Sequence, residues 1–156
     1  MTPPLFDPDL LDAIEGSVEE DFEALVWRQV VSGTDPLKTN SLGARWNPPG
    51  VEVLYCSLSA RGAELELAAL LDRQPIPVTR ARYMHQLAVR LAKVARVTDS
   101  DAFTAAGVCR DSILGEDMTL SQRIGAAAEW LGLRGLIVPS ERHDDDNLVI
   151  ITKRLV

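Results

Sequence analysis

Residues 42–71, LGARWNPPGVEVLYCSLSARGAELELAALL, contain three structural patterns one after another. A loop rich in glycine and proline carries Arg45, a short apolar strand pattern follows and includes Tyr55, and a helical pattern then carries Glu66. Guanidinium, phenol and carboxylate groups together suit a charged ligand that has a flat ring. We therefore expect the rest of the chain to be organised around this stretch.

The helical part of this stretch has Ser59 as its expected N-cap and runs to about residue 72. Four apolar residues share one face of it at helical spacing: Ala63, Leu67, Leu70 and Leu71. Glu66 falls on the same face, where a carboxylate is costly unless another group compensates it. Two interpretations stay open: Glu66 pairs with an arginine or caps a loop, or it belongs to a functional site.

Composition and length describe an ordinary globular chain. It has 156 residues, 46% of them hydrophobic and 25% charged, which fits a single domain. No apolar run approaches the roughly 20 residues of a membrane span, and the N-terminus lacks the features of a signal peptide. Cys56 and Cys109 are too few for a disulfide framework and fit no metal-site spacing. We expect a cytoplasmic protein with no membrane contact and no metal.

The net charge of −7 argues against a role in binding nucleic acid. Such binding depends on lysine and arginine contacts with phosphate, and the sequence has no basic cluster. The acidity fits a basic protein partner, or solubility alone. We expect no direct contact with nucleic acid.

Strand patterns in the sequence are short and scattered. Strands are expected over residues 25–31, 51–56, 82–91, 94–97 and 148–152. The first of them contains Arg28, and the last is expected to be central. Residues 32–50 form a long loop, which in a compact domain is usually functional or disordered, and Trp46 indicates that this one packs.

Helical patterns are fewer than strand patterns. Helices are expected over residues 9–14, from Ser17 onward, over residues 102–106, and from Thr119 to about residue 131. Residues 107–118 are expected to be irregular. Because few helices separate the strands, the pattern favours an α+β fold over a doubly wound α/β fold. We place an N-terminal arm with short helices at residues 1–24 and the main domain at residues 25–156.

The familiar catalytic motifs are absent from the sequence, which has no Gly-x-Gly-x-x-Gly, P-loop, nucleophile elbow or metal-ligand cluster. His85 fits a strand residue and His143 a solvated turn residue. The candidates that remain are Arg28, Arg45, Tyr55, Glu66 and Ser140. A guanidinium fork binds pyrophosphate, a tyrosine face stacks on a cationic ring, a glutamate stabilises an oxocarbenium-like centre, and a serine hydroxyl holds a ribose or carboxamide.

Several segments of the chain resemble the RES-domain family, which is named for an arginine, a glutamate and a serine. They are Gly43-Ala-Arg-Trp-Asn-Pro-Pro-Gly-Val, Leu54-Tyr55, Glu66, Glu129-Trp130-Leu131, Val138-Pro139-Ser140 and Asn147-Leu-Val-Ile. The resemblance covers about residues 25–152. It implies a fold similar to ADP-ribosyltransferases, with a mixed β core and flanking helices, and an activity on NAD that needs no metal.

The resemblance also implies roles for individual residues. The implied catalytic residues are Arg45, Tyr55, Glu66 and Ser140. The residues expected to bind or shape the NAD site are Arg28, Arg45, Trp46, Asn47, Tyr55 and Ser140. In this scheme Arg45 and Arg28 hold the phosphates, and Glu66 stabilises the cationic ribose as its bond to nicotinamide breaks.

The family's biology implies a partner as well as a substrate. Its members form the toxin half of bacterial toxin–antitoxin pairs whose antitoxin carries an Xre-like helix-turn-helix domain. We therefore expect a toxin that forms a hetero-oligomer with such an antitoxin and depletes NAD by hydrolysis or phosphorolysis. The alternatives are transfer of ADP-ribose to a specific protein, a non-catalytic binding module, and a structural domain with a salt bridge between Glu66 and Arg45.

Overall fold

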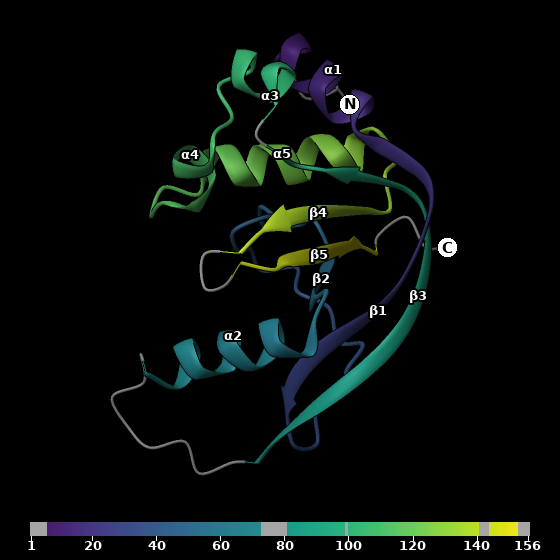
Figure 1. The fold of residues 1–156 in the computed structure, drawn as a ribbon, viewed down its shortest axis with the longest axis vertical. Coiled ribbons are helices and arrows are strands. Elements are labelled where there is room, and N and C mark those ends of the chain that lie inside the picture. Colours follow the sequence, from purple (N-terminus) through teal and green to yellow (C-terminus); the bar gives the residue numbers. More distant parts are fainter. Residues whose placement is uncertain (1–5, 73–80, 99, 141–143, 153–156) are drawn as a thin grey trace.

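Figure 1 shows the computed structural model of the chain, which describes residues 6–72, 81–98, 100–140 and 144–152. The strands in these ranges are β1 (Val18–Val31), β2 (Val53–Ser57), β3 (Arg82–Arg96), β4 (Gly135–Pro139) and β5 (Asp146–Ile151). They pair in the order β1-β2-β5-β4-β3, and β3 pairs in turn with β1, which closes the sheet into a small barrel. The predicted α+β class is confirmed.

Strands β1 and β3 form a long, curved antiparallel pair along one side of the molecule (Figure 1). Their register runs from Val18 opposite Ala95 to Val31 opposite Arg82. The two strands that the sequence predicts within residues 82–97 are therefore one continuous strand. This pair carries four of the described residues that line the cavity described below: Trp27, Arg28, Gln29 and Arg82.

The helix predicted from Ser17 onward is wrong, because the chain enters β1 at Val18. Alternate residues of this part of β1 pack into the core: Phe22, Ala24 and Val26. A helix cap stabilises a helix by only about 1 kcal/mol. The hydrogen bonds of a long strand pair, together with the burial of every second side chain, outweigh that contribution. The domain boundary predicted at residue 25 falls inside this strand.

Strand β5 is central, as predicted, because it pairs antiparallel with β2 on one side and β4 on the other. Its residues 148–151 are at most 5% exposed. Leu148 and Ile150 pack into one hydrophobic cluster, and Val149 and Ile151 pack into another. A strand buried on both faces explains the continuous apolar run in the sequence.

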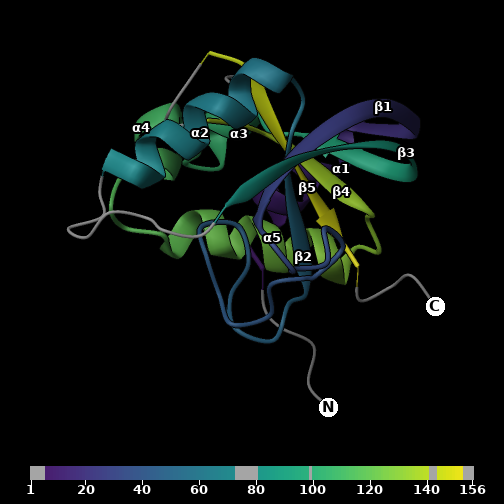
Figure 2. The same ribbon diagram turned by 90° about the horizontal axis from the view of Figure 1, so that it is seen from below.

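The helices lie on two sides of the barrel (Figures 1 and 2). On one side are α1 (Pro8–Gly16), α3 (Asp101–Ala105), α4 (Arg110–Leu114) and α5 (Thr119–Trp130), and on the other is α2 (Ala60–Asp72). The first group shares a core with the sheet, and the large side chains of this core that are at most 2% exposed include Leu10, Ile14, Phe103, Ile124, Leu136 and Ile151. Helix α2 stands apart from this core and instead borders a cavity.

Two local predictions for the helices need correction. Helix α4 lies within residues 107–118, which the sequence predicts to be irregular, because five helical residues are too few to show a period. Thr119 is the first residue of α5, and Met118 occupies the cap position predicted for it. Apart from the helix predicted from Ser17, the other predicted helices, including α2 after Ser59, are confirmed.

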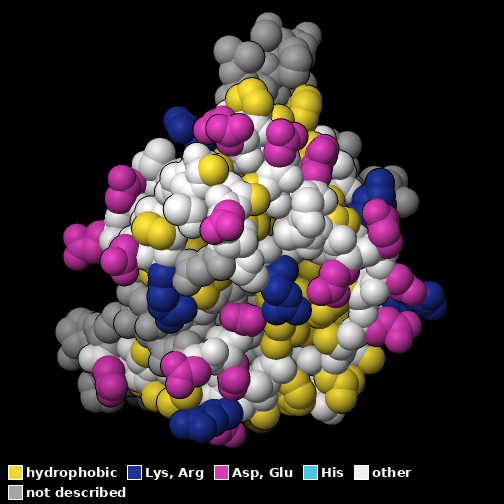
Figure 3. All heavy atoms as spheres, turned by 45° about the horizontal axis from the view of Figure 1, so that its top comes forward, with side chains coloured by type: hydrophobic (Ala, Val, Ile, Leu, Met, Phe, Trp, Pro, Cys, Tyr) yellow, Lys and Arg dark blue, Asp and Glu magenta, His cyan; other side chains and the backbone are white. Residues whose placement is uncertain are grey.

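Charged side chains are spread widely over the surface. On the face shown in Figure 3, acidic side chains are distributed throughout, and basic side chains lie in separate small groups between them. Among the helices that the structure describes, none has the length and apolar character that a membrane span requires. Within the same residues, no three His, Cys, Asp or Glu side chains are grouped to hold a metal ion.

Candidate active site

A cavity of about 640 Å³ lies between α2 and the strands β1, β2 and β3. Its polar lining includes Arg28, Gln29, Tyr55, Glu66, Arg82 and Asn147. The apolar face predicted for α2 turns toward this cavity: Ala63, Leu67 and Leu70 all line it. Glu66 therefore shares its helix face with apolar residues because that face forms one wall of a polar and apolar cavity.

The Glu66 carboxylate is held by residues from two other elements. Its Oε1 atom accepts a hydrogen bond from Ser140 Oγ at 2.7 Å and another from Asn147 Nδ2 at 3.2 Å. Ser140 follows β4 and is only 2% exposed, and Asn147 lies near the start of β5. A carboxylate fixed in this way at a cavity wall is placed to stabilise positive charge on a ligand.

Tyr55 lines the cavity while its hydroxyl group bonds to the long loop. The hydroxyl donates to Asn47 Oδ1 at 2.6 Å and accepts from the backbone N–H of Trp46 at 3.0 Å. Burial raises the pKa of Tyr55 to about 12. Because a raised pKa favours the protonated phenol, Tyr55 is neutral at physiological pH and keeps both hydrogen bonds.

Replacing Tyr55 by phenylalanine is expected to destabilise the protein by about 1–3 kcal/mol. The aromatic ring stays, but the buried side-chain oxygen Oδ1 of Asn47 loses its donor and the backbone N–H of Trp46 loses its acceptor. Denaturant unfolding of Tyr55→Phe beside the wild type measures the difference. Tyr83→Phe is the matched control, since Tyr83 is 56% exposed. Equal loss of stability in both variants would contradict the prediction.

Arg28 contributes a guanidinium group from β1. Its Nε donates to the carbonyl of Pro36 at 2.8 Å, and its Nη1 donates to the carbonyl of Tyr55. These two bonds hold β1 to the long loop and to β2. The Nη2 atom of Arg28 takes part in neither bond. Burial lowers the pKa of Arg28 from its ordinary value, but a guanidinium stays charged at neutral pH. The structure thus places a cation at the cavity, and the contact of Arg28 with NAD stays a prediction.

Arg45 is not among the described residues that line the cavity. Its Nη1 donates to the backbone carbonyls of Ile113 at 3.0 Å and Gly115 at 2.8 Å, at the end of α4. Its positive charge is close enough to Tyr55 to lower the pKa of that phenol, although burial raises the pKa by more. The geometry shows Arg45 bound to α4, and its contact with phosphate stays a prediction.

Trp46 and Asn47 are buried in the protein interior, at 3% and 0% exposure. The Asn47 amide donates to the carbonyls of Val51 at 2.9 Å and Asn40 at 3.2 Å, while its Oδ1 accepts from Tyr55. Asn47 thus joins both arms of the loop to the tyrosine. This geometry gives the two residues a positioning role, and direct contact with NAD stays a prediction for them.

Gly125 in α5 is a residue that the sequence reasoning missed. A Cβ atom placed there would lie 1.7 Å from the carbonyl oxygen of Trp46, so the loop rests directly on this helix position. The signal in the sequence was a glycine inside a strong helical pattern. Such a glycine costs about 1 kcal/mol of helix stability relative to alanine, and it often marks a position where another segment of the chain packs closely against the helix.

Asn147 and Arg82 are further residues of the cavity that the sequence analysis did not assign to the site, although Asn147 begins one of the segments that resemble the family. Asn147 carried a weak signal, as a polar residue directly before an apolar strand. Arg82 begins an alternating strand and carried none. Ser140 is not among the described residues that line the cavity but donates to Glu66, and its predicted contact with the ligand stays a prediction.

The fold and site together define an α+β domain with a cavity that combines a guanidinium, a neutral phenol, an apolar wall and a fixed carboxylate. The RES domain family matches residues 25–156, and the chain belongs to this family. The resemblance identified from the sequence is thereby confirmed.

The chain is similar to proteins named NAD(+) phosphorylase MbcT from Mycobacterium bovis and Mycobacterium tuberculosis. Each is 31% identical over 103 residues, which is 63% of this chain and 55% of the relative. The chain thus spans about half the length of the curated relatives it matches. It also resembles the crystal structure of the M. tuberculosis MbcT–MbcA toxin–antitoxin complex, with a TM-score of 0.78 and 25% identity over 92% of this chain and 82% of that one.

Proposed function

We propose that the chain is the toxin of a toxin–antitoxin pair and that it cleaves the bond between nicotinamide and ribose in NAD. The observation that carries the proposal is the Glu66 carboxylate, held by Ser140 and Asn147 at the wall of the cavity. The activity named for the mycobacterial relatives, NAD(+) phosphorylase, supports it.

The cavity suits a dinucleotide in both size and chemistry. Its volume of about 640 Å³ lies within the range of about 300–1,000 Å³ that is usual for small-molecule sites. Arg28 supplies positive charge that attracts phosphate, and Leu67 and Leu70 offer an apolar wall to a flat ring. The neutral phenol of Tyr55 adds an aromatic face.

In the proposed reaction Glu66 stabilises the positive charge that develops on ribose C1′ as the C1′–N bond breaks. The bonding electrons leave with nicotinamide, which becomes neutral. The oxygen of water or phosphate forms the new bond to C1′ and a proton is released, so that the second product is ADP-ribose or its 1-phosphate. Because Tyr55 stays protonated, its proposed role is packing and orientation rather than proton transfer.

For Arg45 the hydrogen bonds to α4 support a positioning role in addition to the predicted phosphate contact. The backbone N–H of the next residue, Trp46, donates to the hydroxyl of Tyr55. By fixing the loop at this point, Arg45 would keep Tyr55 in the orientation that the cavity requires.

An antitoxin is the proposed protein partner. The solved structure that this chain resembles is a toxin–antitoxin complex of MbcT and MbcA. We extend that arrangement to this chain and propose a hetero-oligomer with an antitoxin of the Xre-like helix-turn-helix type. A toxin that consumes NAD would act in the cytoplasm, where its substrate is available.

The deciding experiment incubates purified protein with NAD, with and without phosphate, and separates the products by chromatography. Release of nicotinamide supports the proposed cleavage, and the second product identifies water or phosphate as the acceptor. Labelled NAD in cell lysate covers the alternative, since label on a protein indicates ADP-ribose transfer. The absence of both nicotinamide release and protein labelling would contradict the proposal.

Ser140→Ala is expected to lower kcat for NAD cleavage by about 10- to 100-fold, with a smaller effect on KM. The variant removes a hydrogen bond to a charged group, typically worth about 1.5–3 kcal/mol, and leaves Glu66 less firmly oriented. Ser121→Ala is the control, because its buried hydroxyl donates to the carbonyl of Met118 at the start of α5. A kcat for Ser140→Ala within twofold of wild type would contradict the positioning role.

A further inference from the structure

The cavity contains a second arginine, Arg82, that neither the resemblance nor the proposed reaction uses. It is the first residue of β3 and lies opposite Val31, the last residue of β1. Its Nε atom is buried and has no hydrogen-bond partner among the residues that the structure describes. A buried donor without an acceptor is costly, by about 1–3 kcal/mol and more for a charged group, so its presence needs an explanation.

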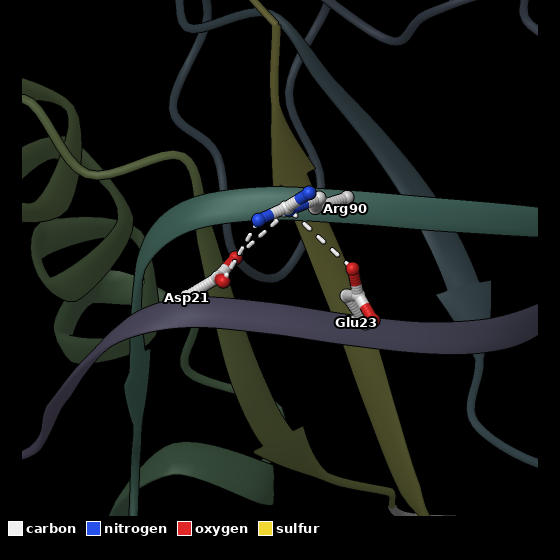
Figure 4. A network of polar contacts seen from close by, with 3 residues as sticks. All are labelled: Asp21, Glu23 and Arg90. Atoms are coloured by element: carbon white, nitrogen blue, oxygen red, sulfur yellow. Dashed lines mark hydrogen bonds and ion pairs between the residues drawn. The ribbon is translucent and has the colours of Figure 1, made fainter.

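Other arginines on β1 and β3 are bonded to protein acceptors. Arg28 donates to two backbone carbonyls. Arg90 on β3 forms ion pairs with Asp21 at 3.1 Å and Glu23 at 3.4 Å, outside the cavity (Figure 4). Arg82 differs because it lines the cavity and its buried Nε has no such acceptor among the residues that the structure describes.

The charge of the cavity favours an anionic ligand. The described lining holds two guanidinium groups, those of Arg28 and Arg82, and one carboxylate, that of Glu66. This local excess of positive charge occurs in a chain whose net charge is −7. A cation kept in a cavity against the overall charge of the protein is typical of an anion-binding site.

The register of β1 and β3 gives the separation of the two arginines along the strand pair. Arg28 lies opposite His85, and Arg82 opposite Val31, so they are three positions apart along the β1–β3 pair. At about 3.3 Å for each residue this separates their backbones by roughly 10 Å. Because three positions is an odd offset in a continuous register, the two side chains leave the strand pair on opposite faces, so Arg82 and Arg28 do not form a pair.

We propose that Arg82 binds a phosphate group in this cavity through its unpartnered Nε and the adjacent guanidinium N–H groups. The phosphate is either the pyrophosphate of the dinucleotide or the free phosphate that accepts ADP-ribose. A guanidinium fork recognises the same oxygen geometry in both. This inference rests on the proposed function, because it names a residue of that same site.

The test compares Arg82→Gln and Arg82→Lys with wild type by calorimetric titration, using ADP-ribose and inorganic phosphate as separate probes. Neither probe is turned over, so binding is measured even if NAD is not cleaved. We expect Arg82→Gln to weaken at least one probe about tenfold, and Arg82→Lys to restore part of it because lysine keeps the charge but lacks the fork. Arg90→Gln is the control, since it removes the same charge from the same strand outside the cavity.

The pattern of loss identifies the phosphate. Weaker binding of ADP-ribose alone assigns Arg82 to the pyrophosphate, weaker binding of phosphate alone assigns it to the acceptor, and loss of both assigns it to a shared position. Circular dichroism and thermal melts establish that the variants are folded. Unchanged binding of both probes by a folded Arg82→Gln variant, or binding of neither probe by the wild type, would overturn the inference.

The two proposals fail in different ways. If the wild type binds ADP-ribose through Arg82 but releases no nicotinamide from NAD, the proposed cleavage is wrong and the phosphate site stands. If nicotinamide is released and Arg82→Gln changes neither the KM for NAD nor the KM for phosphate, the reaction stands and the role of Arg82 is wrong.

Discussion

Glu66→Gln is expected to lower NAD cleavage at least 100-fold while leaving the fold intact. Glutamine has nearly the shape of glutamate, and its carbonyl can still accept from Ser140 and Asn147. It carries no negative charge, so it cannot stabilise a cationic ribose, and loss of one such electrostatic contribution typically costs about 10²–10³ in rate. Nicotinamide release from NAD, followed by chromatography, measures the effect.

The matched control for this variant is Glu64→Gln on the same helix. Glu64 is exposed, so this change removes the same charge from α2 without touching the cavity. Both variants should unfold within about 1 kcal/mol of the wild type. If Glu66→Gln turns over NAD as fast as Glu64→Gln, the carboxylate has no catalytic role and the proposed reaction must be abandoned. In cells, we expect Glu66→Gln to relieve toxicity.

Gly125→Ala is expected to destabilise the protein by about 3 kcal/mol and to impair the site at the same time. The added Cβ would lie 1.7 Å from the carbonyl oxygen and 2.8 Å from the carbonyl carbon of Trp46, which are backbone atoms that cannot rotate away. The loop must therefore shift. Because this loop carries Asn47, which bonds to Tyr55, its displacement reaches the wall of the cavity.

Thermal unfolding and NAD cleavage together check this prediction. For a domain of this length, a loss of 3 kcal/mol corresponds to a drop in Tm of roughly 6–12 °C. Gly16→Ala is the control: Gly16 ends α1, and an added Cβ there has no atom within 4 Å. It should change stability by less than about 1 kcal/mol, in the stabilising direction. A Gly125→Ala variant with wild-type Tm would show that the loop does not rest on α5.

Much of the secondary structure could be predicted because long amphipathic and alternating patterns are local. Helix α2 after Ser59, helix α5, the strand from Arg82 and the central β5 all follow from spacing along the chain. The errors occur where a local signal is short or is outweighed. The capping pattern at Ser17 is overridden by pairing of β1 with β3, and α4 has too few residues to show a period.

The candidate site was only partly predictable for the same reason. Glu66 was conspicuous as a carboxylate on an apolar helix face, and Arg28 and Tyr55 fitted the same chemistry. The local pattern could not show which groups hold the carboxylate, because Ser140 and Asn147 lie 74 and 81 residues further along the chain. The residues that the resemblance marks therefore include some that line the cavity and some that support it.

By itself, the sequence determined the α+β class, most of the elements, the family resemblance and the candidate carboxylate. These follow from periodicity and motifs, which are properties of neighbouring residues. Only the tertiary structure decided that Arg45 bonds to α4 and that the buried Asn47 side chain bonds to Tyr55. It also decided that the backbone of Trp46 packs directly against Gly125 and that Arg82 lines the cavity. Such relations depend on how the barrel closes, because closure brings together side chains whose separation along the chain carries no information about their distance in space.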